Sequence, residues 1–366
     1  MSDADPSLAA ASAYRPWLDG LRGIAVLLVV AEHVGQVAGF WLPPGLGETG
    51  VGIFFGLSGY LITGLLLDEQ AKSGRIRFRA FYLRRAARLL PALVLMLGVS
   101  CAVLVRLGYP EVIRDALYTL FYLANYRTVL QGDYMLGFGQ AWSLAVEEHF
   151  YLMWPLSLMF LARRRSAASL VRWIVIGCAV VLVWRCVLVL LHGPELLIYH
   201  GSIERLDALL YGCAAAVGMR AGWRPGRWLI WYAIAALVTA IMVGDRGVLG
   251  MTLVQAMVGL SSAVLVLGLD AHPSKLRRTL SVPPIVWTGL VSYGIYLWHW
   301  PILIVSVLHF NERNAVITAL LGFVVTPAVA AASYYCFERP VRTAVRDWIA
   351  QRDSRRSTEE RVVAAE

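Results

Sequence analysis

Long apolar segments recur along almost the whole chain, and they limit what it can fold into. Ten predominantly apolar runs, at residues 17–39, 50–68, 88–107, 141–162, 171–191, 203–219, 227–243, 247–268, 285–308 and 314–337, are separated by more polar stretches. A helix of about 20 apolar residues spans the hydrocarbon core of a bilayer. With 58% hydrophobic and 16% charged residues, the chain also has more apolar surface than a soluble core of its size can bury. We therefore predict an all-α polytopic membrane protein, with about ten transmembrane helices in one bundle.

Basic residues are concentrated in alternate loops. The loops after the second, fourth, sixth and eighth runs contain clusters such as Arg84–Arg85, Arg163–Arg165 and Arg277–Arg278, whereas the other loops contain isolated arginines. This asymmetry follows the positive-inside rule and predicts that both termini are cytoplasmic. We expect a cytoplasmic segment at residues 1–16, a membrane domain at 17–340 and a charged cytoplasmic tail at 341–366. The net charge of +9 then reflects membrane topology and contact with lipids, and we expect no nucleic-acid partner.

The first apolar run contains ionisable side chains. His33 lies eleven residues after Arg22, so the two share nearly one helix face, roughly 16 Å apart along the axis. Glu32 precedes His33 directly. Ionisable residues inside a membrane span are costly, so they indicate a functional site.

The loop before the third run is basic and contains interleaved aromatic residues. Its arginines include Arg77, Arg79, Arg84 and Arg85, and Arg88 follows at the start of the run. They have two interpretations, because cationic side chains anchor a loop to anionic lipid, and guanidinium groups also bind phosphates in fixed geometry. Charge alone favours the lipid anchor.

In the fourth run, Ser143, Glu147 and Tyr151 recur every four residues and share a helix face. Glu147 would be costly against lipid, so we expect it to point inward. It has two candidate roles: pairing with an intramembrane arginine, namely Arg22, Arg185 or Arg205, or orienting His33. Pairing is favoured.

Three further segments carry polar groups into apolar runs. Ser58 lies in a glycine-rich stretch, where close helix packing is the favoured interpretation. Arg205 and Asp207 open the sixth run and indicate a buried ion-pair network. Ser292, Tyr296 and His299 align on one helix face, and His299 competes with His33 for a catalytic role. We favour His33, because the tryptophans on either side of His299 are typical of an interfacial belt.

Six blocks together resemble the integral-membrane acyltransferase-3 family, whose members acylate hydroxyl groups of carbohydrates and related acceptors. The blocks are residues 18–25 with the Arg22-to-His33 spacing, 50–59, 81–85, 142–151, 292–299 and 337–340. They occur in the family's order over nearly the whole chain. Many relatives also carry an extracytoplasmic hydrolase-like domain, and we expect this chain to be a short form without one.

The resemblance implies an acyl-CoA donor that is reached from the cytoplasm, with acetyl-CoA favoured, a catalytic His33 and a required partner in Arg22. It makes the loop arginines candidates for donor binding. The family often shows Arg-x-Arg in this loop, but Ala87 replaces one arginine after Arg85. The donor phosphates are therefore assigned either to Arg77 and Arg79 or to Arg84, Arg85 and Arg88.

A thioester is already activated, so the enzyme has to deprotonate and position an acceptor oxygen. We expect His33 to take the proton and Glu32 or Glu147 to orient the imidazole; an acyl-histidine relay is the alternative. Candidate substrate or oxyanion groups are Asp19, Ser58, Ser143, Tyr151, Ser292, Tyr296 and His299. No Cys or His spacing indicates a metal site.

The acceptor is less constrained. A surface or lipid-linked carbohydrate, such as an exopolysaccharide or O-antigen unit, is favoured over a macrolide or other secreted metabolite. The composition fits the inner membrane of a bacterium. From a different class, a transporter or flippase for a saccharide or lipid would also need buried charges, and a non-catalytic membrane scaffold is a third interpretation.

Overall fold

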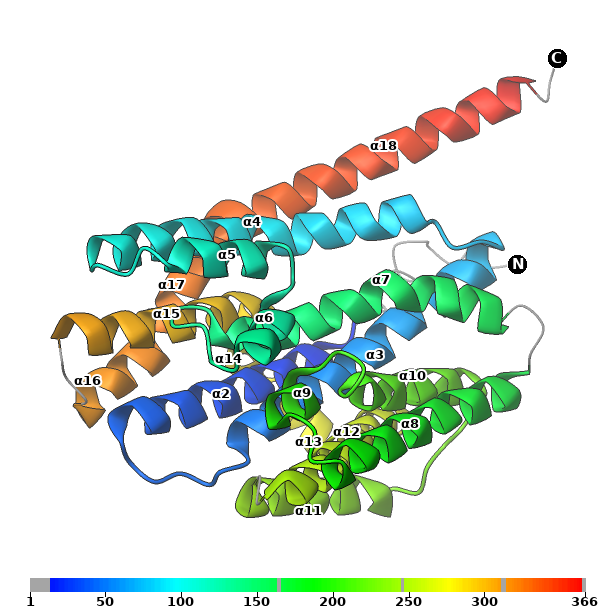
Figure 1. The fold of residues 1–366 in the computed structure, drawn as a ribbon. Coiled ribbons are helices and arrows are strands. Elements are labelled where there is room, and N and C mark those ends of the chain that lie inside the picture. Colours follow the sequence, from blue (N-terminus) through cyan, green and yellow to red (C-terminus); the bar gives the residue numbers. More distant parts are fainter. Residues whose placement is uncertain (1–13, 163–165, 245–246, 311–313, 364–366) are drawn as a thin grey trace.

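The computed structural model describes residues 14–162, 166–244, 247–310 and 314–363, and regular structure within these ranges is helical (Figure 1). The longer helices are α2 (Pro16–Ala38), α3 (Leu46–Ser73), α4 (Phe78–Arg106), α7 (Trp142–Ala162), α8 (Ala167–Leu190), α10 (Leu206–Arg220), α11 (Trp228–Val243), α12 (Gly247–Ala271), α15 (Ser292–Phe310) and α18 (Arg339–Val363). Short helices connect them: α5 (Val112–Leu120), α6 (Ala124–Gln131), η1 (Gly139–Ala141), α9 (Glu195–His200), α13 (Lys275–Leu280), α14 (Pro283–Leu290), α16 (Ala315–Leu320), η2 (Leu321–Val325), α17 (Thr326–Ser333) and η3 (Tyr334–Glu338).

The prediction of an all-α polytopic membrane protein is confirmed. Each predicted apolar run coincides with a helix or with successive helices. Within the described residues, six helices are long and apolar enough to cross a membrane, or seven if one bent pair counts as a span. The count of ten stays a prediction, because α10 and α11, with 15 and 16 residues, are short for a crossing. The cytoplasmic location of the termini also stays a prediction.

Two predicted segments have features that the apolar pattern does not show. The single span expected at 285–308 consists of α14 and α15, which meet at a bend of 67°. The boundary expected at residue 340 lies inside a continuous helical segment, Ala315–Ile349. Its two widened turns, η2 and η3, each precede a proline, Pro327 or Pro340. A proline lacks an amide donor and its ring disturbs the preceding turn, so the helix widens there and continues.

Helices α2 and α3 lie in the middle of the bundle. Helix α2 packs against α3, α14 and α15, and α3 packs against α10 and α12 (Figure 1). Glycines allow the close approach of α3 and α10, since a Cβ on Gly59 would lie 1.9 Å from the carbonyl oxygen of Leu209. The outward side of α8 carries exposed apolar side chains, including Val180 and Val183. Such a surface is suited to lipid.

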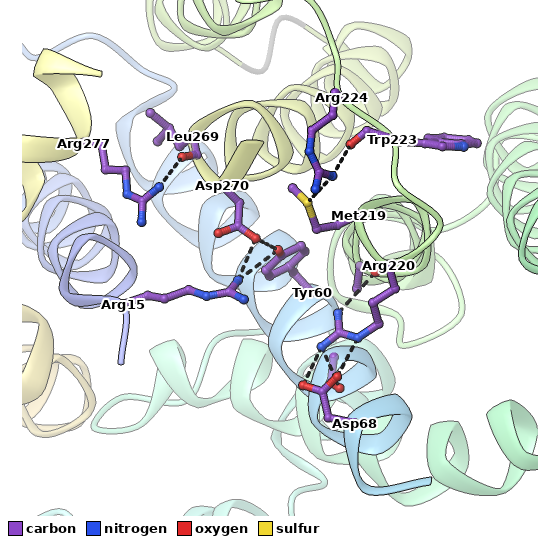
Figure 2. A network of polar contacts seen from close by, with 12 residues as sticks. Arg15, Tyr60, Asp68, Met219, Arg220, Trp223, Arg224, Leu269, Asp270 and Arg277 are labelled. Atoms are coloured by element: carbon purple, nitrogen blue, oxygen red, sulfur yellow. Dashed lines mark hydrogen bonds and ion pairs between the residues drawn. The ribbon is translucent and has the colours of Figure 1, made fainter. Parts of the chain in front are cut away.

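Helix ends that the predicted topology assigns to the cytoplasm lie together (Figure 2). Arg15, before α2, donates to Asp270 of α12 at 2.6 Å, and Tyr60 of α3 donates to the same carboxylate. Nearby, Arg220 of α10 donates to Asp68 of α3 at 2.7 Å (Figure 2). These contacts tie α2, α3, α10 and α12 at one end of the bundle.

Candidate active site

Two histidines from distant parts of the chain are in direct contact. Nδ1 of His33, on α2, lies 2.8 Å from Nε2 of His299, on α15, and the rings stack with centroids 5.0 Å apart. His299 is fully buried, and its Nδ1 lies 3.2 Å from the carbonyl oxygen of Ile295. The structure thus pairs the two residues that the sequence presents as competitors.

The contacts assign the protons of this pair. The Ile295 carbonyl only accepts, so Nδ1 of His299 donates to it, and Nε2 of a neutral His299 is then an acceptor. Nδ1 of His33 therefore donates to His299. In two neutral rings, this arrangement leaves the lone pair of His33 on Nε2. A histidine in that tautomer is suited to accept a proton at Nε2.

His33 lines a cavity of about 700 Å³, which we call the histidine cavity. Its polar lining includes Glu32, Gln36, Gln140, Glu195 and His200, and its aromatic lining includes Tyr134, Trp142, Tyr199, Tyr296 and Trp300. His200 lies on α9, between two predicted spans, and burial lowers its pKa to about 4. It is therefore neutral near pH 7. The cavity combines flat apolar rings with hydrogen-bonding groups.

A second, smaller hollow of about 80 Å³, the Glu147 cavity, adjoins the first, and the two share Val51 and Tyr296. Its lining includes the predicted residues Arg22, Ser58, Ser143, Glu147, Tyr151 and Ser292. Within it, Ser58 donates to Glu147 at 2.6 Å. The hydroxyl of Tyr296 donates to the Gln140 carbonyl at 2.9 Å, so Ser143 donates to Tyr296 at 2.6 Å. Tyr296 therefore stands where the two cavities meet.

A third hollow, the arginine groove, has a volume of about 350 Å³ and shares Arg85 and Arg88 with the Glu147 cavity. Arg84 lines it as well. Arg85 forms an ion pair with Glu148 and stacks on Tyr151. Arg77 and Arg79 line none of these three hollows, and Arg77 pairs with Glu69 at 2.9 Å. Of the two arginine sets left open by the sequence, the later one faces the groove.

Two of the three arginines named as alternative partners of Glu147 bind other carboxylates, and the third, Arg22, lines the same cavity as Glu147. Glu147 does not pair with Arg185 or Arg205, because Arg185 binds Asp207 at 2.5 Å and Arg205 binds Glu48 at 2.7 Å. All four of these partners are buried, so both ion pairs lie inside the bundle. Glu147 contacts Ser58 instead and belongs to the cavity next to that of His33.

The other acidic candidates also have partners of their own. Glu32 accepts a hydrogen bond from the Gly47 amide at 2.7 Å, which links the end of α2 to the start of α3. Asp19 accepts from Tyr14 at 2.9 Å and lies 3.4 Å from Arg22, and it lines none of the three hollows. A carboxylate at that place is suited to hold Arg22, which itself lines the Glu147 cavity.

The sequence does not point to the aromatic wall of the histidine cavity. Tyr134 and Tyr199 lie in connecting segments outside the apolar runs, so no helical periodicity marks them. The sequence does not point to Glu48 either, because it lies in a glycine-rich stretch and its partner, Arg205, is 157 positions away. In the part of the chain that the structure describes, no group of three or more His, Cys, Asp or Glu side chains is arranged for a metal ion.

Comparison with known proteins identifies relatives. Residues 15–335 match a family model described as an acyltransferase domain. The chain is 34% identical over 364 residues to the "Putative peptidoglycan O-acetyltransferase YrhL" of Bacillus subtilis, covering 90% of this chain and 55% of that protein. It is 31% identical over 357 residues to "O-acetyltransferase OatA" of Staphylococcus aureus, covering 90% of this chain and 57% of the relative.

A third relative, "Peptidoglycan O-acetyltransferase OatA" of Listeria monocytogenes, is 32% identical over 358 residues, with 90% of this chain and 56% of that protein covered. The chain thus spans just over half the length of these relatives. No solved structure is significantly similar to it. The family match covers most of the sequence, and the resemblance carried by the six blocks is confirmed. The chain belongs to the integral-membrane acyltransferase-3 family.

Proposed function

We propose that this protein is an O-acetyltransferase of a bacterial cytoplasmic membrane, which moves an acetyl group from acetyl-CoA to a hydroxyl group of a carbohydrate. The observation that carries the proposal is the succession of three adjoining hollows. The arginine groove meets the Glu147 cavity at Arg85 and Arg88, and the Glu147 cavity meets the histidine cavity at Val51 and Tyr296. The names of the relatives indicate the chemistry, O-acetyl transfer.

In this proposal, His33 is the general base. Its Nε2 takes the proton of the acceptor hydroxyl while the oxygen attacks the thioester carbonyl carbon. The tetrahedral intermediate then collapses, the carbon–sulfur bond breaks, and the imidazolium returns its proton to the departing thiolate. The products are an acetyl ester and free CoA. His299 holds His33 in the required tautomer through Nδ1.

The donor occupies the first two hollows. Its phosphates bind guanidinium groups in the arginine groove, because a guanidinium matches a phosphate through two parallel hydrogen bonds. Its thioester arm passes through the Glu147 cavity, whose lining includes Ser58, Glu147 and Ser292 as partners for amides. Arg22, roughly 16 Å from His33 along α2, acts on the donor and does not contact the imidazole.

The acceptor occupies the histidine cavity. A sugar presents apolar C–H faces and outward hydroxyls, and the cavity provides aromatic rings for the former and carboxylates and amides for the latter. Peptidoglycan appears in the names of two relatives, so its glycan strands are the first acceptors to examine. A macrolide is the alternative acceptor.

The test uses full-length protein in nanodiscs with acetyl-CoA labelled in the acetyl group. We expect label to move to a glycan acceptor with release of CoA, and His33→Ala to abolish both while the protein remains folded. A matched control is His309→Ala, which alters an exposed histidine on the same helix as His299. Full activity of His33→Ala would refute the base assignment. Movement of a saccharide or lipid across the bilayer without consumption of acetyl-CoA would instead favour a transporter.

A further inference from the structure

The arginine groove has two walls, and only one belongs to the segment that the sequence marks for donor binding. Helix α4 contributes Arg84, Arg85 and Arg88. The opposite wall is the first part of α18, which contributes Arg339, Arg342 and Arg346. These three are spaced by three and four positions and therefore share one helix face. The first part of helix α18 packs against α4, and the rest of the helix diverges from α4 and projects beyond it (Figure 1).

The two walls have the same charge. Arg88 lies within electrostatic range of Arg22, Arg85 and Arg342. In the described part of the chain, no hydrogen bond or ion pair is formed by the guanidinium groups of Arg84, Arg88, Arg339 and Arg342. The guanidinium group of Arg85 pairs with Glu148, and that of Arg346 pairs with the neighbouring Asp347. The carboxylate of Glu338 interacts electrostatically with Arg342 and Arg88, and it also accepts a hydrogen bond from Ser333 at 3.3 Å.

Packed helices with facing guanidinium groups repel each other unless an anion lies between them. Several convergent guanidinium groups suit a ligand with more than one phosphate, because each can bind a phosphate through a planar fork. The groove also shares Arg85 and Arg88 with the Glu147 cavity, where the thioester arm is proposed to pass.

We propose that the first turns of α18 form the second half of the donor's phosphate site, with Arg342 as its central residue, so that the phosphates of CoA are held between α4 and α18. This inference rests on the proposed use of a CoA donor. It adds residues that lie some 250 positions after the basic loop, since Arg342 and Arg88 are that far apart in the sequence. It also gives the first turns of α18 a role in binding.

The experiment measures CoA affinity by calorimetry in nanodiscs of zwitterionic lipid, with full-length protein. We expect Arg342→Gln to weaken CoA binding by about tenfold or more, since it removes a hydrogen bond between charged groups. Arg84→Gln should have a similar effect. Binding of S-acetylpantetheine, which has no phosphate, should be unchanged in both variants. Arg342→Lys retains the charge without the fork and should fall between the parent and Arg342→Gln.

The matched control is Arg352→Gln, which alters an arginine of the same helix that stacks on Trp348 outside the groove. Its CoA affinity should equal that of the parent, and the melting temperatures of the ligand-free variants should agree. The inference is overturned if Arg342→Gln binds CoA like the parent while Arg84→Gln does not, and the CoA donor then stands. It is also overturned if Arg342→Gln changes binding only in anionic nanodiscs, which would assign the groove to lipid headgroups. If the parent protein does not bind CoA at all, the proposed donor itself fails.

Discussion

Replacing His299 tests the tautomer assignment at the centre of the proposed mechanism. In His299→Ala, Nδ1 of His33 loses its acceptor, so the imidazole is free to place its hydrogen on Nε2, the atom required as base. The variant loses the hydrogen bond that favours one tautomer of His33. Such a bond is worth about 1 kcal/mol. Its loss should lower kcat by roughly fivefold.

The companion variant is His299→Gln. Its side-chain oxygen lies near the position of the histidine Nε2 and accepts from Nδ1 of His33, so the productive tautomer is favoured again. We expect it to recover most of the lost kcat. The KM for acetyl-CoA should be unchanged in both variants, because His299 lines neither the arginine groove nor the Glu147 cavity.

The assay is initial-rate release of CoA at saturating donor and acceptor, with nitrogen-15 NMR of labelled histidine as a direct readout of the His33 tautomer. A merely structural role for His299 would lower the amount of folded protein and leave kcat per folded molecule intact. The reasoning fails if His299→Ala keeps kcat within twofold of the parent, or if His299→Gln is as impaired as His299→Ala.

Three further predictions concern stability and the acceptor. Gly59→Ala places a Cβ 1.9 Å from the Leu209 carbonyl oxygen and should destabilise the fold by about 1–3 kcal/mol, seen as a lower melting temperature. The control is Gly98→Ala, where a Cβ meets nothing within 4 Å and the melting temperature should not fall. Equal effects of the two substitutions would contradict the packing argument. Arg205→Leu leaves Glu48 buried without its ion-pair partner and should lower the free energy of unfolding by about 3–5 kcal/mol. Unchanged thermal stability would contradict the importance of this pair. Trp300→Ala removes a ring from the histidine cavity and should raise the KM for the carbohydrate but not for acetyl-CoA; a change in the donor KM alone would argue against that assignment.

Some contacts were beyond the sequence because they join distant residues. The helical face of Ser292, Tyr296 and His299 is visible in the spacing, yet nothing in it shows that His299 meets a residue 266 positions earlier. The tryptophan beside it suggested an interfacial belt, but Trp300 packs edge-on against His33 with centroids 4.8 Å apart. An aromatic neighbour has the same appearance in a sequence whether it faces lipid or a cavity.

The partners of buried charges were equally undetermined. The cost of an ionisable group in a membrane predicts that Glu147, Arg205 and Asp207 need partners of opposite charge. The sequence alone does not distinguish among the intramembrane groups that could be those partners. Folding selects among them by distance: Arg205 reaches Glu48, Arg185 reaches Asp207, and Ser58 reaches Glu147. Helix orientation also turns Arg84 and Arg88 toward the groove, whereas Arg77 and Arg79 line none of the three hollows.

The sequence by itself determined that the chain is a helical membrane protein of the acyltransferase-3 family, because apolar run length and the order of local blocks are properties of neighbouring residues. It also marked His33 as a candidate base, since an imidazole within an apolar run stands out without any knowledge of the fold. Only the tertiary structure decided that His299 holds His33, that Glu147 belongs to the adjoining cavity, and that α18 faces the arginines of α4. Those relations depend on how helices pack across the bundle, and the side chains that meet there are separated by up to 266 positions in the chain.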